Sequence, residues 1–233
     1  MVKNKFIQSL ATSISKKEKL LAILIDPDVF DNSEVEYFLN KLPYQTTHLF
    51  VGGSTVEKDK TEATVIALKT HSSLPIFLFP GDVTQITQKA DGILFLSLIS
   101  GRNPEYLIGQ HVRSVSKLRD SSLEILATGY ILIEGGNESA VERVSETKPM
   151  SHNDIQAIVD TALAGEFLGM KLIYLEAGSG AKFPVNTNII SAVKEAINIP
   201  LFVGGGIKNE VQKKEAYNAG ADLLVMGTFF ENN

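Results

Sequence analysis

Leu20-Leu21-Ala22-Ile23-Leu24-Ile25-Asp26-Pro27-Asp28 is the stretch that decides the fold of this chain. Residues 20–25 form its longest unbroken apolar run, which is typical of a strand buried on both faces of a parallel sheet. The run ends in an acidic turn, whereas an open dinucleotide-binding sheet carries a G-x-G-x-x-G loop at this point. Six apolar residues are also too few for a membrane span or a signal-peptide core.

Seven further short apolar runs follow within the 233 residues, mostly separated by segments with helical spacing. Ser151, Thr187 and Asn209 lead three of these segments and are predicted to cap helices. Strands alternating with helices over a length close to ~250 residues favour a closed α/β barrel, the (β/α)8 or TIM barrel. An open doubly wound sheet is the alternative. No change of composition divides the chain, so we expect one domain over residues 1–233. The predicted strands are 20–25, 48–51, 75–79, 92–96, 123–126, 171–175, 200–203 and 222–226.

Three segments do not fit a regular strand–helix alternation. The amphipathic segment 3–17 precedes the first strand and is predicted either to plug the bottom of the barrel or to pack outside it. The polar stretch 134–150 is predicted to be a flap over the site or a solvated loop. Only residues 227–233 follow the last strand, so the eighth helix is missing, replaced by segment 3–17, or supplied by a neighbouring subunit.

Composition excludes several classes of function. With 22 Lys and Arg against 27 Asp and Glu, the net charge of −5 provides no basic field for nucleic acid or for a stable contact with anionic lipid. The absence of cysteine excludes thiolate catalysis, disulfides and cysteine-ligated metal, and agrees with a cytoplasmic location. The four histidines lie outside the predicted strand ends, and we expect them at the surface.

Glycine-rich loops follow the last two strands. Gly204-Gly205-Gly206 and Gly227-Thr228 would meet at the carboxyl ends of neighbouring strands, where barrel enzymes bind their ligands. Glycine lets main-chain N–H groups approach an anion closely, and a helix N-terminus beyond the loop adds partial positive charge. Two such loops in succession favour a phosphate site over simple tight turns.

The predicted sixth strand ends in a similar loop, Tyr174-Leu175-Glu176-Ala177-Gly178-Ser179-Gly180. It combines a carboxylate that could act as a general base with further main-chain amides for an anion. After the first two strands, Asp26 and the Ser54 hydroxyl are predicted to hold Mg²⁺ together with substrate oxygens. Asp28 is better explained by turn and helix-cap chemistry.

These motifs together resemble the geranylgeranylglyceryl phosphate synthases and their heptaprenylglyceryl phosphate synthase relatives. The resemblance covers most of the chain, and the motifs occur in the family's order. Leu24 stands where the heptaprenyl branch carries lysine, which places the chain nearer the geranylgeranyl group. The motifs are Leu24-Ile25-Asp26-Pro27-Asp28, Val51-Gly52-Gly53-Ser54, Tyr174 to Gly180, Val203-Gly204-Gly205-Gly206-Ile207 and Gly227-Thr228.

The resemblance implies a magnesium-dependent prenyltransferase that joins sn-glycerol 1-phosphate to geranylgeranyl or another polyprenyl diphosphate and releases pyrophosphate. It implies an ether-lipid precursor as product, a homo-oligomer, and at most transient membrane contact through that product. By position, Asp26 and Ser54 would bind the metal, and Glu176 and Tyr174 would be catalytic. The residues expected to bind glycerol phosphate are Tyr174, Leu175, Glu176, Ala177, Gly178, Ser179, Gly180, Gly205, Gly206, Gly227 and Thr228.

The prenyl tail is predicted to lie in an apolar groove against Phe79, Leu96, Leu98 and Tyr130. A phosphosugar isomerase or cyclase of the same barrel class is the main alternative, with Asp26 and Glu134 as its acid and base. A phosphate-binding scaffold without catalysis is a third possibility.

Overall fold

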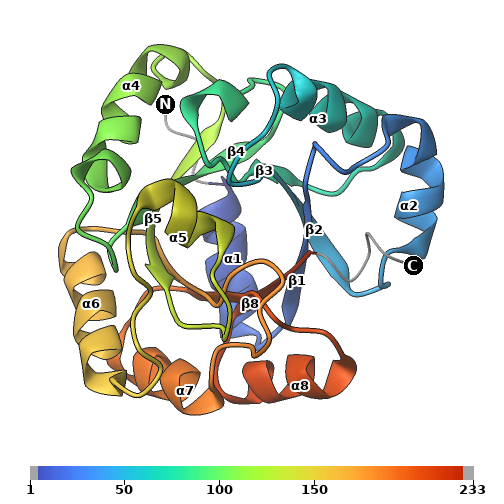
Figure 1. Ribbon diagram of the computed structural model, residues 1–233. Coiled ribbons are helices and arrows are strands. Elements are labelled where there is room, and N and C mark those ends of the chain that lie inside the picture. The colour runs from blue at the N-terminus through green and yellow to red at the C-terminus, as the bar shows by residue number, and fades with distance from the viewer. Residues whose placement is uncertain (1–4, 228–233) are drawn as a thin grey trace.

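The structure is a computed structural model that describes residues 5–227. Its centre is a closed barrel of parallel strands in chain order (Figure 1). The barrel closes where β8 pairs with β1, with Leu20 opposite Leu223. This confirms the predicted (β/α)8 class and every predicted strand. The strands are β1 Leu20–Ile25, β2 Thr46–Val51, β3 Ile76–Leu78, β4 Gly92–Leu98, β5 Glu124–Leu132, β6 Leu172–Glu176, β7 Leu201–Gly204 and β8 Leu223–Met226.

Helices surround the barrel, except between β3 and β4, where the connection contains only the short 3₁₀ turn η2. Asn209 caps α8 as predicted, because its side chain accepts a hydrogen bond from the Gln212 N–H. The predictions for Ser151 and Thr187 were wrong: Asp154 and Asn186 accept the capping bonds instead. The elements outside the sheet are α1 Lys5–Ser15, η1 Asn32–Glu34, α2 Val35–Lys41, α3 Lys60–His71, η2 Val83–Gln85, the π-helical turn η3 Glu105–Gly109, α4 Gln110–Leu118, α5 Ala140–Ser145, α6 Ile155–Phe167, α7 Thr187–Ala196 and α8 Glu210–Asn218.

The strands are apolar throughout because both of their faces are covered. Successive side chains point to opposite faces, so Leu20 and Ala22 fill the barrel interior while Leu21 and Ile23 pack outward. The outward side chains join the layer between the barrel and the helices. The same alternation in β6 turns Tyr174 toward the barrel interior and Leu175 toward the helices.

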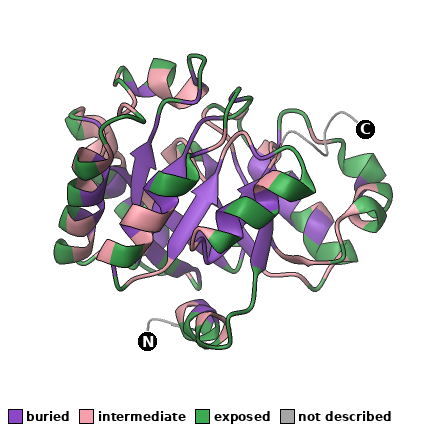
Figure 2. Ribbon diagram, turned by 90° about the horizontal axis from the view of Figure 1, so that it is seen from below, coloured by how far each residue is buried: buried purple, intermediate pink, exposed green. Residues whose placement is uncertain are grey.

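Helix α1 closes the lower end of the barrel, as Figure 2 shows. The Phe6 ring packs 4.3 Å from the Phe77 ring inside the barrel. The buried Glu124 carboxylate accepts hydrogen bonds from the Phe6 and Ile7 N–H groups at 2.8 and 3.0 Å. A carboxylate at the first turn of a helix satisfies amides that have no partner within the helix. Of the two predicted positions for segment 3–17, the plug is therefore the one observed.

Segment 134–150 contains the short helix α5, which lies across the open end of the barrel (Figure 1). Two side chains from the β4–α4 connection hold its carboxyl end. Asn103 Nδ2 donates to the Ser145 carbonyl at 2.8 Å, and the Tyr106 hydroxyl donates to the Val144 carbonyl at 2.9 Å. The segment is thus an ordered cover rather than a solvated loop.

Two of the four histidines contradict the expectation that all lie at the surface. His48 and His111 are buried in β2 and α4. Burial lowers the pKa of His48 to about 4, and its Nδ1 pairs with the Thr47 hydroxyl at 2.7 Å. Thr228 and any helix after β8 lie outside the described residues. Within residues 5–227, no helix has the length and apolar character needed to cross a bilayer.

Candidate active site

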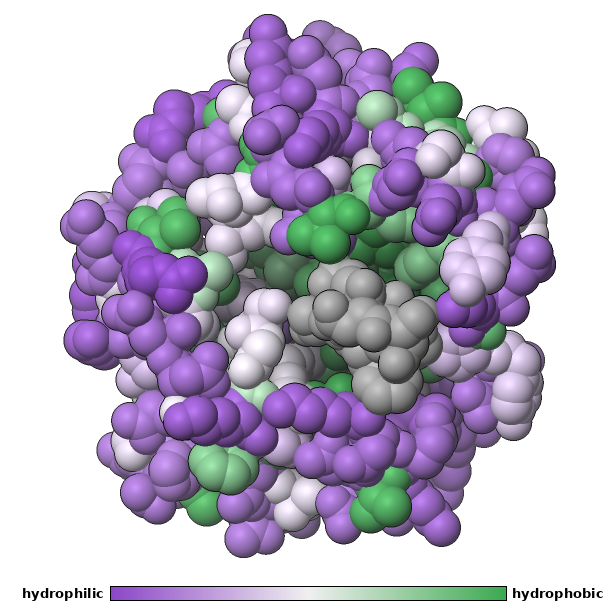
Figure 3. All heavy atoms as spheres, turned by 45° about the vertical axis from the view of Figure 1, so that its right-hand side comes forward, coloured by the Kyte–Doolittle hydropathy of each residue, from purple (hydrophilic) through white to green (hydrophobic). Residues whose placement is uncertain are grey.

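A cavity of about 620 Å³ opens at the carboxyl ends of the strands. Figure 3 shows hydrophobic residues gathered in a hollow of this face, ringed by hydrophilic ones. Chain segments that are far apart in the sequence meet here, since each strand end contributes a loop. The predicted site residues that line the cavity are Asp26, Ser54, Tyr174, Glu176, Ser179, Gly180, Gly205, Gly206 and Gly227.

Tyr174 and Glu176 point into this cavity from the carboxyl end of β6. Burial raises the pKa of the Glu176 carboxyl to about 7, although the nearby Tyr174 hydroxyl and the Gly178 N–H, 2.7 Å from Oε1, both act to lower it. The Tyr174 hydroxyl is buried and finds no partner with hydrogen-bond geometry within residues 5–227, despite its proximity to Glu176. The pair therefore offers a carboxyl that titrates near neutrality and a hydroxyl with a free bond to make.

Gly205 and Gly206 form the part of the wall that follows β7, with φ angles of +80° and +70°. A side chain at Gly205 would strike Glu176 Oε1 and come within 2.7 Å of the Gly178 nitrogen. At Gly206, a Cβ atom would lie 2.8 Å from the Phe183 carbonyl oxygen. Both positions require glycine because of the left-handed backbone and because the β6 loop packs directly against them.

Three predicted binding residues do not present a side chain or a free amide to the cavity. The Leu175 side chain packs outward into the layer beneath the helices, because it alternates with Tyr174 and Glu176. The Ala177 N–H donates to the Gly204 carbonyl at 3.1 Å, and the Gly178 N–H is bound to Glu176. The Gly178 amide therefore holds the Glu176 carboxylate and the Ala177 amide holds the β6–β7 junction, so neither is free for an anion, and the Leu175 side chain points away from the cavity.

Asp26 and Ser54 face the cavity from the loops after β1 and β2. Asp26 Oδ1 accepts the Asp28 N–H at 2.9 Å, and a Cβ atom at Gly53 would lie 3.2 Å from Oδ2, so the two loops touch. Burial, together with the neighbouring Asp28 charge, raises the pKa of Asp26. Throughout residues 5–227 no three His, Cys, Asp or Glu side chains converge as a metal cluster. A divalent ion here would depend on Asp26, Ser54 and ligand oxygens, which is how Mg²⁺ is commonly held.

Asp28 and Glu134 lie outside this arrangement. The Asp28 carboxylate is 3.3 Å from the Lys60 ammonium and accepts the Glu57 N–H, so it ties the β1 loop to the segment before α3 rather than capping its own turn or a helix. The Glu134 carboxylate is 3.2 Å from His152 Nδ1 in a separate surface pocket. Asp26 and Glu134 therefore do not share a cavity, which removes the acid–base pair of the isomerase alternative.

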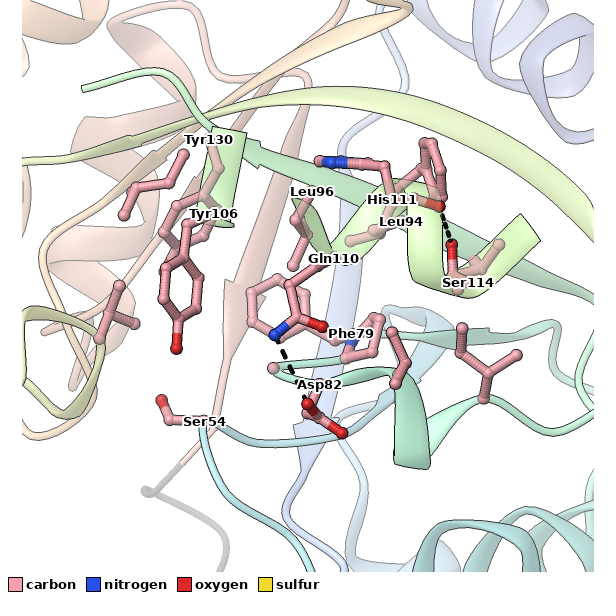
Figure 4. Close-up of a pocket in the computed structure, with 18 of the residues that line it drawn as sticks. Ser54, Phe79, Asp82, Leu94, Leu96, Tyr106, Gln110, His111, Ser114 and Tyr130 are labelled. Atoms are coloured by element: carbon pink, nitrogen blue, oxygen red, sulfur yellow. Dashed lines mark hydrogen bonds between the residues drawn. The ribbon is translucent and has the colours of Figure 1, made fainter. Parts of the chain in front are cut away.

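A second, smaller cavity of about 110 Å³ adjoins the first and shares Gly53, Ser54, Phe79, Tyr130 and Val141 with it. Phe79, Leu96, Leu98 and Tyr130, the predicted groove, all line it, and Figure 4 shows most of them around its space. Its walls are largely apolar. The structure thus joins a polar chamber with glycine loops to a narrow apolar one.

Sequence reasoning did not single out several residues of these walls. Lys208 lines the polar cavity directly after the Gly206-Ile207 turn, a position that could have been noticed. The buried Gln85 side chain binds both main-chain polar groups of Gly53 and so fixes the loop that carries Ser54. Val141 comes from α5 and covers both cavities. No local motif marks Gln85 or Val141, because each contacts parts of the site that are distant from it in the sequence.

Comparison with known proteins agrees with this geometry. A model of the PcrB family matches residues 13–233. The chain belongs to the PcrB family. This PcrB-family chain is 56% identical over 228 residues to the geranylgeranylglyceryl phosphate synthase of Zunongwangia profunda, with 98% of this chain and 97% of the relative covered. It is 51% identical over 227 residues to the synthase of Flavobacterium johnsoniae, covering 97% and 93% of the two chains.

Among solved structures, (S)-3-O-geranylgeranylglyceryl phosphate synthase from Thermoplasma acidophilum superposes with a TM-score of 0.89 at 29% identity. The match covers 97% of this chain and 92% of the other, whose crystal holds the substrate sn-glycerol-1-phosphate. The expected family is therefore confirmed. The PcrB-family chain is an enzyme, a prenyltransferase of the geranylgeranylglyceryl phosphate synthase type.

Proposed function

We propose that this enzyme transfers a polyprenyl group from its diphosphate to the primary hydroxyl of sn-glycerol 1-phosphate. Geranylgeranyl is the polyprenyl group that we propose first. The observation that carries the proposal is the junction of a polar chamber, walled by Glu176 and the glycine loops, with an apolar chamber beside Ser54. One substrate has a small polar anion and the other a long hydrocarbon tail, so two adjoining chambers of opposite character suit the pair.

Glycerol phosphate is assigned to the polar chamber. Its phosphate would lie against Ser179, Gly180, Gly205 and Gly206; the three glycines have positive φ angles and no side chain, which allows close approach. The Tyr174 hydroxyl would bind a glycerol oxygen and thereby gain the partner that it lacks within residues 5–227. Lys208 at the same wall adds one positive charge to a cavity that otherwise carries the Asp26 and Glu176 carboxylates.

The reaction follows from the placement of these groups. Glu176, with a pKa of about 7, is partly deprotonated at neutral pH and accepts the proton of the attacking hydroxyl. The hydroxyl oxygen forms an ether bond to the first carbon of the prenyl chain as the bond from that carbon to the diphosphate oxygen breaks. Pyrophosphate leaves with the bonding electron pair. The fixed loops hold the hydroxyl next to the reacting carbon and so lower the entropic part of the barrier.

Asp26 and Ser54 fit a magnesium site at the junction of the two chambers. One carboxylate and one hydroxyl leave most coordination positions for diphosphate oxygens and water, which is the usual donor set for this ion. When bound there, Mg²⁺ would neutralise the charge that develops on the leaving diphosphate. The inward side chain of Asp26 and the contact between the β1 and β2 loops hold this donor pair in place.

Product identification tests the proposal directly. The protein is incubated with Mg²⁺, sn-glycerol 1-phosphate and geranylgeranyl diphosphate, and the lipid extract is analysed by mass spectrometry with pyrophosphate measured in parallel. We expect a prenylglyceryl phosphate and an equal amount of pyrophosphate, both lost on chelation of the metal. The enantiomer sn-glycerol 3-phosphate is the control. Absence of product with every prenyl length tried would disprove the assignment.

A further inference from the structure

The loop that carries Ser54 contains two glycines. Gly52 and Gly53 connect β2 to Ser54, and main chain without side chains has many conformations open to it. Ser54 nevertheless lines both cavities, in a loop that touches Asp26: a Cβ atom at Gly53 would lie 3.2 Å from Asp26 Oδ2. The position of Ser54 relative to Asp26 therefore depends on what restrains Gly53.

The Gln85 side chain supplies a restraint of this kind. It is only 2% exposed and comes from η2, the short turn between β3 and β4. Its Oε1 accepts the Gly53 N–H at 3.2 Å, and its Nε2 donates to the Gly53 carbonyl at 2.8 Å. Both polar ends of this buried amide are thus paired with one residue. The carbonyl belongs to the peptide that joins Gly53 to Ser54, so the bond sets the orientation of the chain entering Ser54.

Gly81 holds the same peptide from the loop after β3. Its N–H donates to the Gly53 carbonyl at 3.1 Å, so this oxygen accepts two hydrogen bonds. A Cβ atom at Gly81 would lie 2.5 Å from the carbonyl oxygens of both Gly53 and Ser54. The contacts of Gln85 and Gly81 with this peptide are called the Gly53 clamp below.

The turn that carries Gln85 is itself anchored at both sides. The Asp82 side chain caps η2 by accepting the Thr84 N–H at 2.7 Å. The Lys117 ammonium of α4 donates to the Val83 carbonyl, also at 2.7 Å. A support that is fixed in this way can restrain the loop packed against it.

We propose that Gln85 is a positioning residue for the divalent-cation site and that it holds the Ser54 hydroxyl where it can share an ion with Asp26. The inference rests on the proposed function, which assigns Mg²⁺ to these two residues. Mg²⁺ requires near-ideal octahedral geometry, and groups that orient metal ligands commonly contribute about 10- to 100-fold to affinity or activity. Gln85 lines neither cavity, so its effect should reach the metal and leave the binding of glycerol phosphate unchanged.

Gln85→Met tests this role, because it removes both hydrogen bonds and keeps an unbranched side chain of similar length. Binding of Mn²⁺, which takes the same oxygen ligands, is measured by electron paramagnetic resonance with inorganic pyrophosphate present and a protein-free blank. We expect the Kd for Mn²⁺ and the Mg²⁺ concentration for half-maximal rate each to rise about tenfold or more. The kcat at saturating Mg²⁺ and the metal-free Kd for sn-glycerol 1-phosphate should stay within about threefold of the native values.

Gly81→Ala perturbs the Gly53 clamp from its other side and keeps the proposal testable if Gln85→Met does not fold. Gly81 has no positive φ, so alanine acts there through its collision with the Gly53 and Ser54 carbonyls. The same weakening of metal binding is expected. An unchanged Kd for Mn²⁺ in either folded variant overturns the proposal.

Thr87→Val is the matched control for a purely structural role. Thr87 is buried in the same connection as Gln85, but its hydroxyl donates to Glu62 and makes no contact with the Ser54 loop. The valine variant should melt at a lower temperature and keep the Kd for Mn²⁺ within about twofold. If it weakens metal binding as much as Gln85→Met does, or if Gln85→Met weakens glycerol phosphate binding equally, Gln85 is only structural and the proposal is wrong.

Metal binding is measured without turnover, which distinguishes failure of this proposal from failure of the proposed function. Weaker Mn²⁺ binding in Gln85→Met, in a protein that turns over no prenyl diphosphate, supports the clamp and contradicts the transferase reaction. Turnover with an unchanged metal dependence supports the reaction and contradicts the clamp. If Asp26→Ala binds Mn²⁺ as well as the native protein does, or if neither binds it, the metal assignment and the clamp both fall.

Discussion

Buried carboxylates at the closed end of the barrel differ in their partners from the Tyr174–Glu176 pair at the open end. At the closed end, the Glu124 carboxylate accepts two amides of α1, and Asp222 Oδ2 accepts the Leu201 N–H and the Lys194 ammonium, each at 2.7 Å. At the open end, the buried Tyr174 hydroxyl is unpaired within residues 5–227, and burial raises the pKa of Glu176 to about 7. Paired groups stabilise the fold, whereas unsatisfied ones are available to a ligand and cost stability until it binds. Substitutions at the two ends should therefore affect different properties.

The largest effect is expected from Asp26→Ala at the open end. Loss of the carboxylate that anchors the metal should lower kcat/KM by about 1,000-fold or more, whereas the free energy of unfolding should change by less than about 1 kcal/mol. Steady-state kinetics and urea unfolding measure the two quantities. Asp28→Ala is the matched control, because that carboxylate pairs with Lys60 away from the cavity, and it should cost less than about tenfold in rate. Equal losses in both variants would refute the distinction between the two aspartates.

Glu176→Gln should lower kcat by about 100-fold and stabilise the protein at alkaline pH. The folded state holds the Glu176 proton more tightly than the unfolded state, whose pKa is near 4.5. The stabilisation from that proton is complete below pH 4.5 and is lost as the pH rises through about 7. The loss amounts to about 3 kcal/mol at most.

Urea titrations of both proteins at pH 5 and pH 8 measure this difference. The native enzyme should lose stability between the two pH values relative to the glutamine variant, whose amide still accepts the Gly178 N–H. If the stabilities of the two proteins changed in parallel with pH, burial would not raise the pKa of Glu176. A pH–rate profile adds a second check, because the limb near pH 7 should disappear in the variant.

At the closed end the expectation is reversed. Glu124→Ala leaves the first amides of α1 without an acceptor and should lower the free energy of unfolding by about 2 kcal/mol. The kcat/KM of the protein that remains folded should stay within about twofold, since α1 lies at the far side of the barrel. Glu18→Ala, at an exposed ion pair, is the control and should change stability by less than about 0.5 kcal/mol. A large fall in kcat/KM for Glu124→Ala would show that the two ends are coupled.

The smallest effect concerns a glycine of the polar chamber. Gly205→Ala combines a positive φ with a collision against Glu176, and should raise the KM for glycerol phosphate about tenfold, or about 1.4 kcal/mol. Gly169→Ala has a similar φ of +89° but open space around the added Cβ, so it isolates the backbone contribution. It should lower stability by about 1 kcal/mol and leave KM unchanged. An unchanged KM for Gly205→Ala would show that this loop does not bind the substrate.

The strands were predictable because burial on both faces requires a continuous apolar run, and such a run can be recognised within a few residues of sequence. The glycine loops were predictable too, since their order along the chain fixes their order around the rim. Prediction was weaker where residues compete for one role. Thr187 and Asn186 are neighbours that can both cap a helix, and it is the Asn186 side chain that accepts the Asn188 N–H. Treating the β6 motif as a block hid the fact that side chains in a strand alternate, so the Leu175 side chain points away from the cavity.

The distant contributions were not predictable. Gln85 fixes the Ser54 loop from the β3–β4 connection, and Val141 covers both cavities from α5. His111 was expected at the surface because it lies outside the predicted strand ends, yet the packing of α4 buries it. Each of these roles depends on which segment lies opposite, and nothing in the local pattern records that.

The order of residues along the chain was enough to specify the barrel, the rim loops and the chemical type of the groups gathered there, because hydrophobic periodicity and glycine geometry act over a few residues. The three-dimensional packing alone determined that α1 closes the lower end, that the Tyr174 hydroxyl lacks a partner within residues 5–227, that the pKa of Glu176 rises, and that α4 contributes Gln110 and His111 to the wall of the apolar cavity. These properties depend on burial and on contacts between distant segments, which exist only once the barrel has closed.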